Sequence, residues 1–213
     1  EGRRDAERKA QSDAASVSTL LEARLAATIR RLRGDLEALS ATLPRDAFRT
    51  ALPGRYNDAV VSTLDLHVRH FPEVAGFCVV DASGGFLYAS NASLQKAGTD
   101  ALADSPSLFA GSGNSLNFSA VVLDKASGRS LQAVAVAVRD ARGELQGGVV
   151  ALLDLTYLAK TFDSINVGAN GVISLRRIDD SRLIFRRPER AGLINQAVSN
   201  NPLHERLAAG EKQ

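Results

Sequence analysis

A leucine-rich stripe runs along residues 3 to 43 and constrains the fold of this chain more than any other feature. Its apolar members recur four and three residues apart, and they are Leu25, Ile29, Leu32, Leu36, Leu39 and Leu43. This is the 3.5-residue period of a heptad repeat, so the segment is predicted to be one long helix that ends at Pro44. A helix of about 40 residues is about 60 Å long, more than a small domain needs.

The apolar face of this helix has two possible packing partners, and the sequence does not decide between them. It can pair with a second copy as a dimer seam, for which the candidate residues are Leu25, Ile29, Leu32 and Leu36. Alternatively, its C-terminal half can pack against its own domain. The first residues, EGRRDAERKA, are almost all polar, and the stripe weakens toward them.

Beyond the stripe, short apolar segments alternate with turns. A second helix is expected at residues 55–70 and a β-hairpin at 76–90, GFCVVDASGGFLYAS, in which Asp81 is expected to bond turn amides. A long polar connection, residues 91–115, follows, with a short helix candidate around Ala101. Three further strands and a closing helix are predicted at 116–124, 130–140, 144–155 and 156–165. Five antiparallel strands with flanking helices describe an α+β domain of PAS-like type.

The hairpin plan repeats after residue 166, in GVISLRRIDDSRLIFRR. Two helical segments are expected after it, at 189–198 and 201–209, and the three closing strands of the first unit have no counterpart. The predicted organisation is a long helix (1–50), a first PAS-like subdomain (51–166) and a partial, smaller second one (167–213).

Composition narrows the function classes. The 26 basic and 24 acidic side chains nearly balance, so nothing indicates a nucleic-acid partner. The single cysteine, Cys78, forms no internal disulfide and is expected to be a buried apolar residue. His67 and His70 have no companion ligands in sequence, and no metal or cofactor is expected. No phosphate loop or nucleophile elbow is present, so no enzymatic activity is expected of this chain.

In the order and spacing of its motifs, the chain resembles the extracytoplasmic double Cache (PDC, PAS-like) sensor domains of bacterial membrane receptors. The segments that carry the resemblance are ARLAATIRRLRGDLEAL, VAGFCVVDASGGFLYAS, GELQGGVVALLDLTYLAKTF and VGANGVISLRRIDDSRLIFRRP. The last is most similar to sensors attached to diguanylate cyclases, then to those of histidine kinases. The resemblance implies a periplasmic location, membrane spans on either side and a cytoplasmic output domain. The spans are expected outside this sequence, which lacks methionine and any apolar run long enough to cross a bilayer.

The resemblance also implies a small-molecule ligand in the membrane-distal first subdomain. The Arg and Trp-Tyr part of the family's amino-acid-binding signature is absent, and only Asp154 falls where its acidic residue would be. Strand position selects the candidate ligand-binding residues, which are Tyr88, Ser90, Phe118, Ser119, Gln132, Val134 and Asp154. Asp154 can instead cap the helix that starts at Thr156. Two alternatives to a kinase or cyclase sensor remain: a chemoreceptor sensor domain, and a ligand-free dimerisation spacer.

Overall fold

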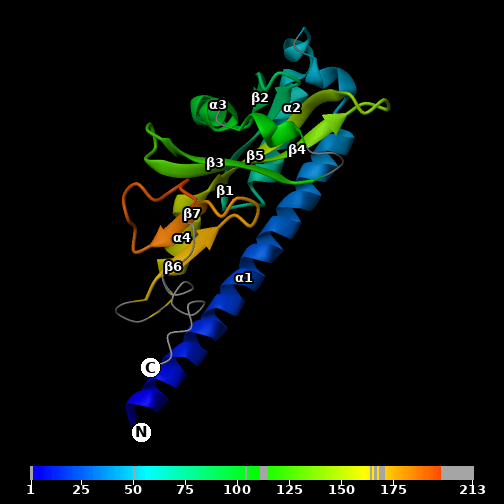
Figure 1. The fold of residues 1–213 in the computed structure, drawn as a ribbon. Helices are drawn as coiled ribbons and strands as arrows, with labels where there is room; N and C mark the ends of the chain where they lie inside the picture. The colour runs from blue at the N-terminus through cyan, green and yellow to red at the C-terminus, as the bar shows by residue number, and fades with distance from the viewer. Residues whose placement is uncertain are drawn as a thin grey trace. The chain divides into compact units, whose positions relative to one another are not determined.

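The computed structural model describes residues 2–49, 51–103, 105–110, 115–163, 165, 167 and 171–197. The chain, drawn as a ribbon in Figure 1, divides into two compact units, residues 1–165 and 166–213. Within the described residues, no helix combines the length and the apolar character that a membrane span requires.

The long helix predicted from the stripe is confirmed as α1, Gly2–Thr42. The C-terminal half of α1 packs against the sheet of the first unit. Its leucines Leu32, Leu36 and Leu39 are fully buried there. Leu32 and Leu36 are therefore core residues of their own subunit, and the dimer-seam assignment is wrong for these two. Leu25 and Ile29 are only partly buried and stay open to a second helix.

Two further elements connect α1 to the sheet. A 3₁₀ turn, η1, spans Arg45–Phe48 after Pro44, and α2 spans Pro53–Val68 with proline in its first turn. Proline suits that position because it has no backbone N–H to leave unsatisfied. On α2, Val60 and Leu64 form the buried face, as their spacing of four residues predicts.

The sheet of the first unit has five antiparallel strands in the order β2-β1-β5-β4-β3. The strands are β1 (Val74–Asp81), β2 (Phe86–Ala89), β3 (Asn117–Asp124), β4 (Arg129–Arg139) and β5 (Leu145–Asp154). The last strand thus lies in the middle. From Gly147 onward it is buried, as its nearly continuous apolar run predicts. A short helix, α4 (Leu155–Asp163), leaves its end.

Helical elements cover both faces of this sheet. On one face α2 packs on Phe77 of β1, whose ring meets those of His67 and Phe71 edge-on. On the other lie η2 (Ala92–Leu94), α3 (Gln95–Ala103) and η3 (Pro106–Phe109), whose apolar side chains share a core with Cys78 and neighbouring strand residues. The long connection is therefore more helical than predicted. Cys78 is buried as expected.

The described part of the second unit is a hairpin of β6 (Ile173–Arg176) and β7 (Leu183–Arg187). The helix predicted from residue 189 is absent up to residue 197, where the chain makes turns and a bridge to Arg182. Gly192 and Asn195 have φ of 75° and 66°, values that end any right-handed helix. The helix predicted at 201–209 lies outside the described residues.

Candidate functional site

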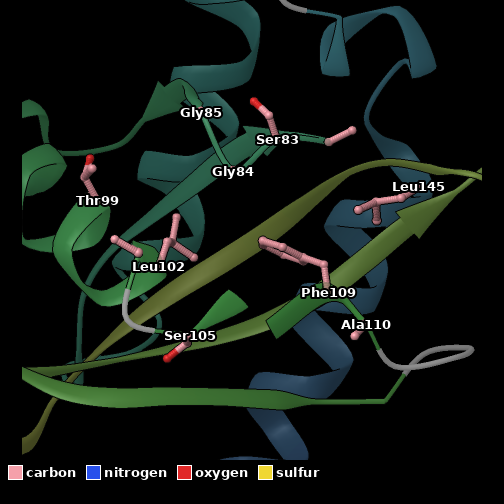
Figure 2. Close-up of a pocket in the computed structure, with 11 residues that line it drawn as sticks. Ser83, Gly84, Gly85, Thr99, Leu102, Ser105, Phe109, Ala110 and Leu145 are labelled. Atoms are coloured by element: carbon pink, nitrogen blue, oxygen red, sulfur yellow. The ribbon is translucent and has the colours of Figure 1, made fainter. Parts of the chain in front are cut away.

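A cavity of about 660 Å³ opens at the end of the sheet where the β1–β2 turn, α3, η3 and the start of β5 meet (Figure 2). Cavities of this volume hold small ligands in other proteins. Its lining residues come from these four elements and are Ala82, Ser83, Gly84, Gly85, Thr99, Leu102, Ala103, Ser105, Phe109, Ala110 and Leu145.

The rim on the hairpin side is a turn built by Asp81. One oxygen of its carboxylate accepts hydrogen bonds from the backbone N–H groups of Ser83 and Gly85, at 2.8 and 2.9 Å, and from the Ser83 hydroxyl at 2.6 Å. Gly84 has φ of 85°, a left-handed conformation that glycine adopts without strain. The predicted bonding of turn amides by Asp81 is confirmed, and these bonds fix the conformation of the turn at the rim of the cavity.

The opposite wall is the ring of Phe109, which rests directly on the backbone of β5. A side chain at Gly148 would place its Cβ 2.2 Å from Cε1 of Phe109, so only glycine allows this approach. The end of η3 is held by Arg139, whose guanidinium donates to the Phe109 carbonyl at 2.8 Å. Its start is held by Ser105, whose hydroxyl accepts from the Ala120 N–H at 3.0 Å.

The chemical character of the cavity is uncharged. Among the described lining residues none carries a formal charge, and the polar side chains are hydroxyls, those of Ser83, Thr99 and Ser105. Leu102, Phe109 and Leu145 supply apolar surface (Figure 2). Such a lining favours an uncharged ligand, because an ion would lose its hydration without gaining a counter-charge.

The candidate residues selected by strand position are not gathered at this cavity, and none of them lines it. Tyr88 pairs with Val79, and Phe118 pairs with Val134, which places these side chains on the sheet face that α1 and α2 cover. Tyr88 and Val134 are 3% and 0% exposed. Strand position alone therefore does not identify the residues that line this cavity.

Ser119 and Gln132 make hydrogen bonds across a β-bulge between β3 and β4. The register of β3 on β4 shifts between Phe118 and Val121, which leaves ladder groups to be satisfied by side chains. The Ser119 hydroxyl accepts from the Ala133 N–H, and the Gln132 amide donates to the Ser119 carbonyl, both at 2.9 Å. These bonds satisfy two buried polar side chains within the sheet.

Asp154 and Ser90 also satisfy backbone groups. Asp154 accepts from the Tyr157 N–H at 3.0 Å and pairs with Arg129 at 3.3 Å, so its capping interpretation is confirmed. The Ser90 hydroxyl accepts from the Phe77 N–H at 2.9 Å, at the edge of the sheet.

Two histidines, His67 and His70, lie in the described part of the chain. Among the residues that the structure describes, no group of three His, Cys, Asp or Glu side chains could hold a metal ion. His67 instead contacts Asp35 of α1.

Three solved structures show which known fold this is. No protein-family model matches the sequence, and no curated protein matches it. The extracellular domain of rpHK1S-Z16, described as a histidine kinase, is 19% identical with a TM-score of 0.67, over 90% of this chain and 75% of that one. The sensor domain of the V. cholerae histidine kinase DctB is 17% identical with a TM-score of 0.56, over 87% and 69%.

The third comparison comes from another receptor class. The ligand-binding domain of the Pseudomonas aeruginosa PAO1 amino acid chemoreceptor PctC, solved with GABA, is 19% identical with a TM-score of 0.53, over 85% of this chain and 77% of that one. The chain therefore has the fold of extracellular sensor domains of histidine kinases and chemoreceptors, as the resemblance seen in the sequence predicted.

Proposed function

We propose that this chain is the extracytoplasmic ligand-sensing domain of a membrane-bound bacterial signalling protein, and that its small-molecule ligand binds in the 660 Å³ cavity. The cavity carries the proposal: it is large enough for a small metabolite and lies on the sheet face opposite the long helix. The sensor fold of the first unit supports it. In this proposal the chain itself catalyses no reaction.

The route from cavity to α1 is short. Phe109 rests on Gly148 of β5, and the opposite face of β5 packs against α1, where Leu32 and Leu36 are buried. An occupant that displaces the Phe109 ring would favour one arrangement of β5 against α1 over another. The helix would convey that change through membrane spans outside this sequence to a cytoplasmic diguanylate cyclase or histidine kinase. A chemoreceptor output is the alternative, and Leu25 and Ile29 remain as the homodimer contact.

The ligand is proposed to be uncharged. GABA, present in the PctC structure, carries an ammonium and a carboxylate, and each needs a charged or strongly polar partner. The described lining of this cavity offers hydroxyls, backbone groups and apolar surface instead. A neutral molecule with an apolar body and one or two hydrogen-bonding groups suits it better than an amino acid.

A thermal-shift screen of the 213-residue chain tests this proposal. The panel pairs neutral compounds, such as nucleobases, cyclic dipeptides and sugars, with amino acids and organic acids. A ligand at 100 times its Kd adds about 2.7 kcal/mol of stability, a shift of several degrees. Ala103→Trp fills the cavity from an exposed position and should abolish the shift, whereas Lys125→Trp, an exposed residue of the β3–β4 turn, should retain it.

The rival function is a ligand-free dimerisation spacer. It gains support if a well-folded sample shows no shift with any compound, or if Ala103→Trp responds as the unmodified chain does. Sedimentation of Ile29→Asp then becomes the informative measurement. Loss of a dimer would identify α1 as the functional surface, because Ile29 lies in the part of the stripe that its own unit only partly buries.

A further inference from the structure

A second cavity, of about 480 Å³, lies within the first unit between α1 and α4, and we name it the α1–α4 groove. Its lining residues come from α1, from the two residues before β1 and from α4: Arg24, Leu25, Ala27, Thr28, Arg31, Pro72, Glu73, Tyr157, Leu158, Thr161 and Phe162. None of them lines the 660 Å³ cavity. The groove is therefore a separate place for a ligand.

One ion pair in the groove is already satisfied. Glu73 is only 5% exposed, and its Oε1 lies 2.5 Å from Nη2 of Arg31. The Arg31 guanidinium also lies over the ring of Phe71, 4.7 Å from the centroid. A buried carboxylate needs such a partner. Glu73 is thus compensated within the protein and leaves little attraction for a ligand cation.

Arg24 is the unbalanced charge of the groove. It lies two helical turns before Arg31 on the same face of α1, with its side chain exposed. Within the part of the chain that the structure describes, no ion pair to Arg24 is present. The lining therefore carries two positive charges and one negative charge, an excess that favours an anion.

The wall opposite Arg24 is apolar at depth. Leu158 and Phe162, which face the groove from α4, are 9% and 6% exposed, so their side chains form its floor. Tyr157 is 41% exposed and brings a hydroxyl to the rim. A charged rim above an apolar floor matches a molecule with a single anionic group on an apolar body.

We propose that the α1–α4 groove binds a small organic anion, with its carboxylate or sulfonate on the guanidinium of Arg24 and its apolar body on Leu158 and Phe162. Arg31 keeps N–H donors beyond the one used by Glu73 and can add a second contact, since a guanidinium has five. A molecule bound there contacts α1 and α4 at once and ties the two helices together. The site is independent of the ligand proposed for the larger cavity.

The probe for this site is 1-anilinonaphthalene-8-sulfonate, an aromatic sulfonate whose fluorescence rises on transfer to an apolar surface, with octanoate as the competitor. We expect saturable binding to the 213-residue chain that octanoate displaces. Arg24→Gln should weaken binding about tenfold, as expected for loss of a charge-assisted hydrogen bond. Arg30→Gln is the matched control, because it removes an exposed α1 charge outside the groove.

A second pair of variants tests the place rather than the charge. Ala27→Trp fills the groove from an exposed helix position and should abolish binding, whereas Ala26→Trp, one residue away and outside the lining, should leave it intact. The proposal is overturned if Arg24→Gln and Ala27→Trp bind the probe with the affinity of the unmodified chain. It is also overturned if the unmodified chain shows no saturable binding. Loss of binding in Ala103→Trp would place the probe in the larger cavity and also overturn it.

Discussion

Nδ1 of His67 lies 2.6 Å from Oδ2 of Asp35, a contact that joins α2 to α1. Both side chains are partly buried, and the His67 ring packs edge-on against Phe77 with centroids 6.2 Å apart. The pair therefore links the long helix, the second helix and the first strand at one point. In the proposed sensor, this point holds α1 in register with the sheet.

Substitution of His67 tests how much its contact with Asp35 contributes to the free energy of unfolding. His67→Ala removes a hydrogen bond to a carboxylate, which should lower the free energy of unfolding by about 1.5–3 kcal/mol in a urea titration. His70→Ala is the control, because His70 is exposed and should change stability by no more than about 0.5 kcal/mol. Equal effects in the two variants would remove the special role of the Asp35 contact.

The burial of Leu36 predicts a large asymmetry along α1. Leu36→Ala empties a fully buried position and should cost about 2–5 kcal/mol. Leu20, which is 68% exposed, should tolerate alanine with a change below about 0.5 kcal/mol. Chemical denaturation of the two variants at one protein concentration measures both values. A small loss at Leu36 would mean that the helix and sheet are not packed as described.

The contact between Phe109 and Gly148 predicts opposite signs for two glycine substitutions. Gly148→Ala forces the ring away from β5 and should destabilise the chain by about 1–3 kcal/mol. Gly34→Ala lies inside α1 with no heavy atom near the new methyl group, and it should stabilise by up to about 1 kcal/mol. Melting temperatures distinguish the outcomes. An unchanged Gly148→Ala protein would show that Phe109 does not rest on the strand.

Asp154 is predicted to act on stability and not on ligand binding. Asp154→Ala removes the cap of α4 and the pair with Arg129, and the loss should be about 0.5–2 kcal/mol. Any ligand found in the thermal-shift screen should produce the same shift with this variant as with the unmodified chain. If folded Asp154→Ala no longer shows the ligand-induced thermal shift, Asp154 takes part in ligand binding and this prediction is wrong.

Asp124 provides a pH-dependent prediction. The Ser127 hydroxyl donates to its carboxylate, and this bond, with help from the N–H of Ala126, lowers the pKa of Asp124 below its usual value. A lowered folded-state pKa contributes stability above the unfolded value of about 3.9, and that stability is lost as pH falls through the folded pKa. Asp124→Asn should therefore narrow the difference in melting temperature between pH 7 and pH 3. Asp13→Asn, at an exposed position of α1, should leave it unchanged.

Turn chemistry explains why much of the fold could be predicted. Asp81 and Asp140 each accept bonds from amides of their own turn, and each precedes by three residues a glycine with positive φ, Gly84 and Gly143. Such turns depend on four or five neighbouring residues, so a local pattern is sufficient to locate the strands around them. The apolar period of α1 is similarly local.

The partner of an apolar face is not local, and a sequence pattern does not identify it. A heptad stripe looks the same whether it packs on a second helix or on its own sheet, so it predicts a dimer seam through Leu32 and Leu36 as readily as a core position. Likewise, alternation shows that a strand has two faces but not which one borders a cavity. The cavity wall depends on the approach of Phe109 to Gly148, across 39 residues, which no spacing rule reports.

The pairing of β1 with β5, the first and last strands of the five-stranded sheet, also has a consequence for biosynthesis. Val74 pairs with Leu153, and the backbone N–H of Asp154 donates to the Glu73 carbonyl at 2.8 Å. The ribosome must therefore synthesise β5, which ends 73 residues after the end of β1, before the centre of the sheet can close, since β5 lies between β1 and β4. Sheet formation by such distant pairing is slow. Nascent chains that end before β5 have the β1–β2 and β3–β4 hairpins but lack the strand that joins them, so the apolar inner edges of both hairpins are unpaired until β5 is made.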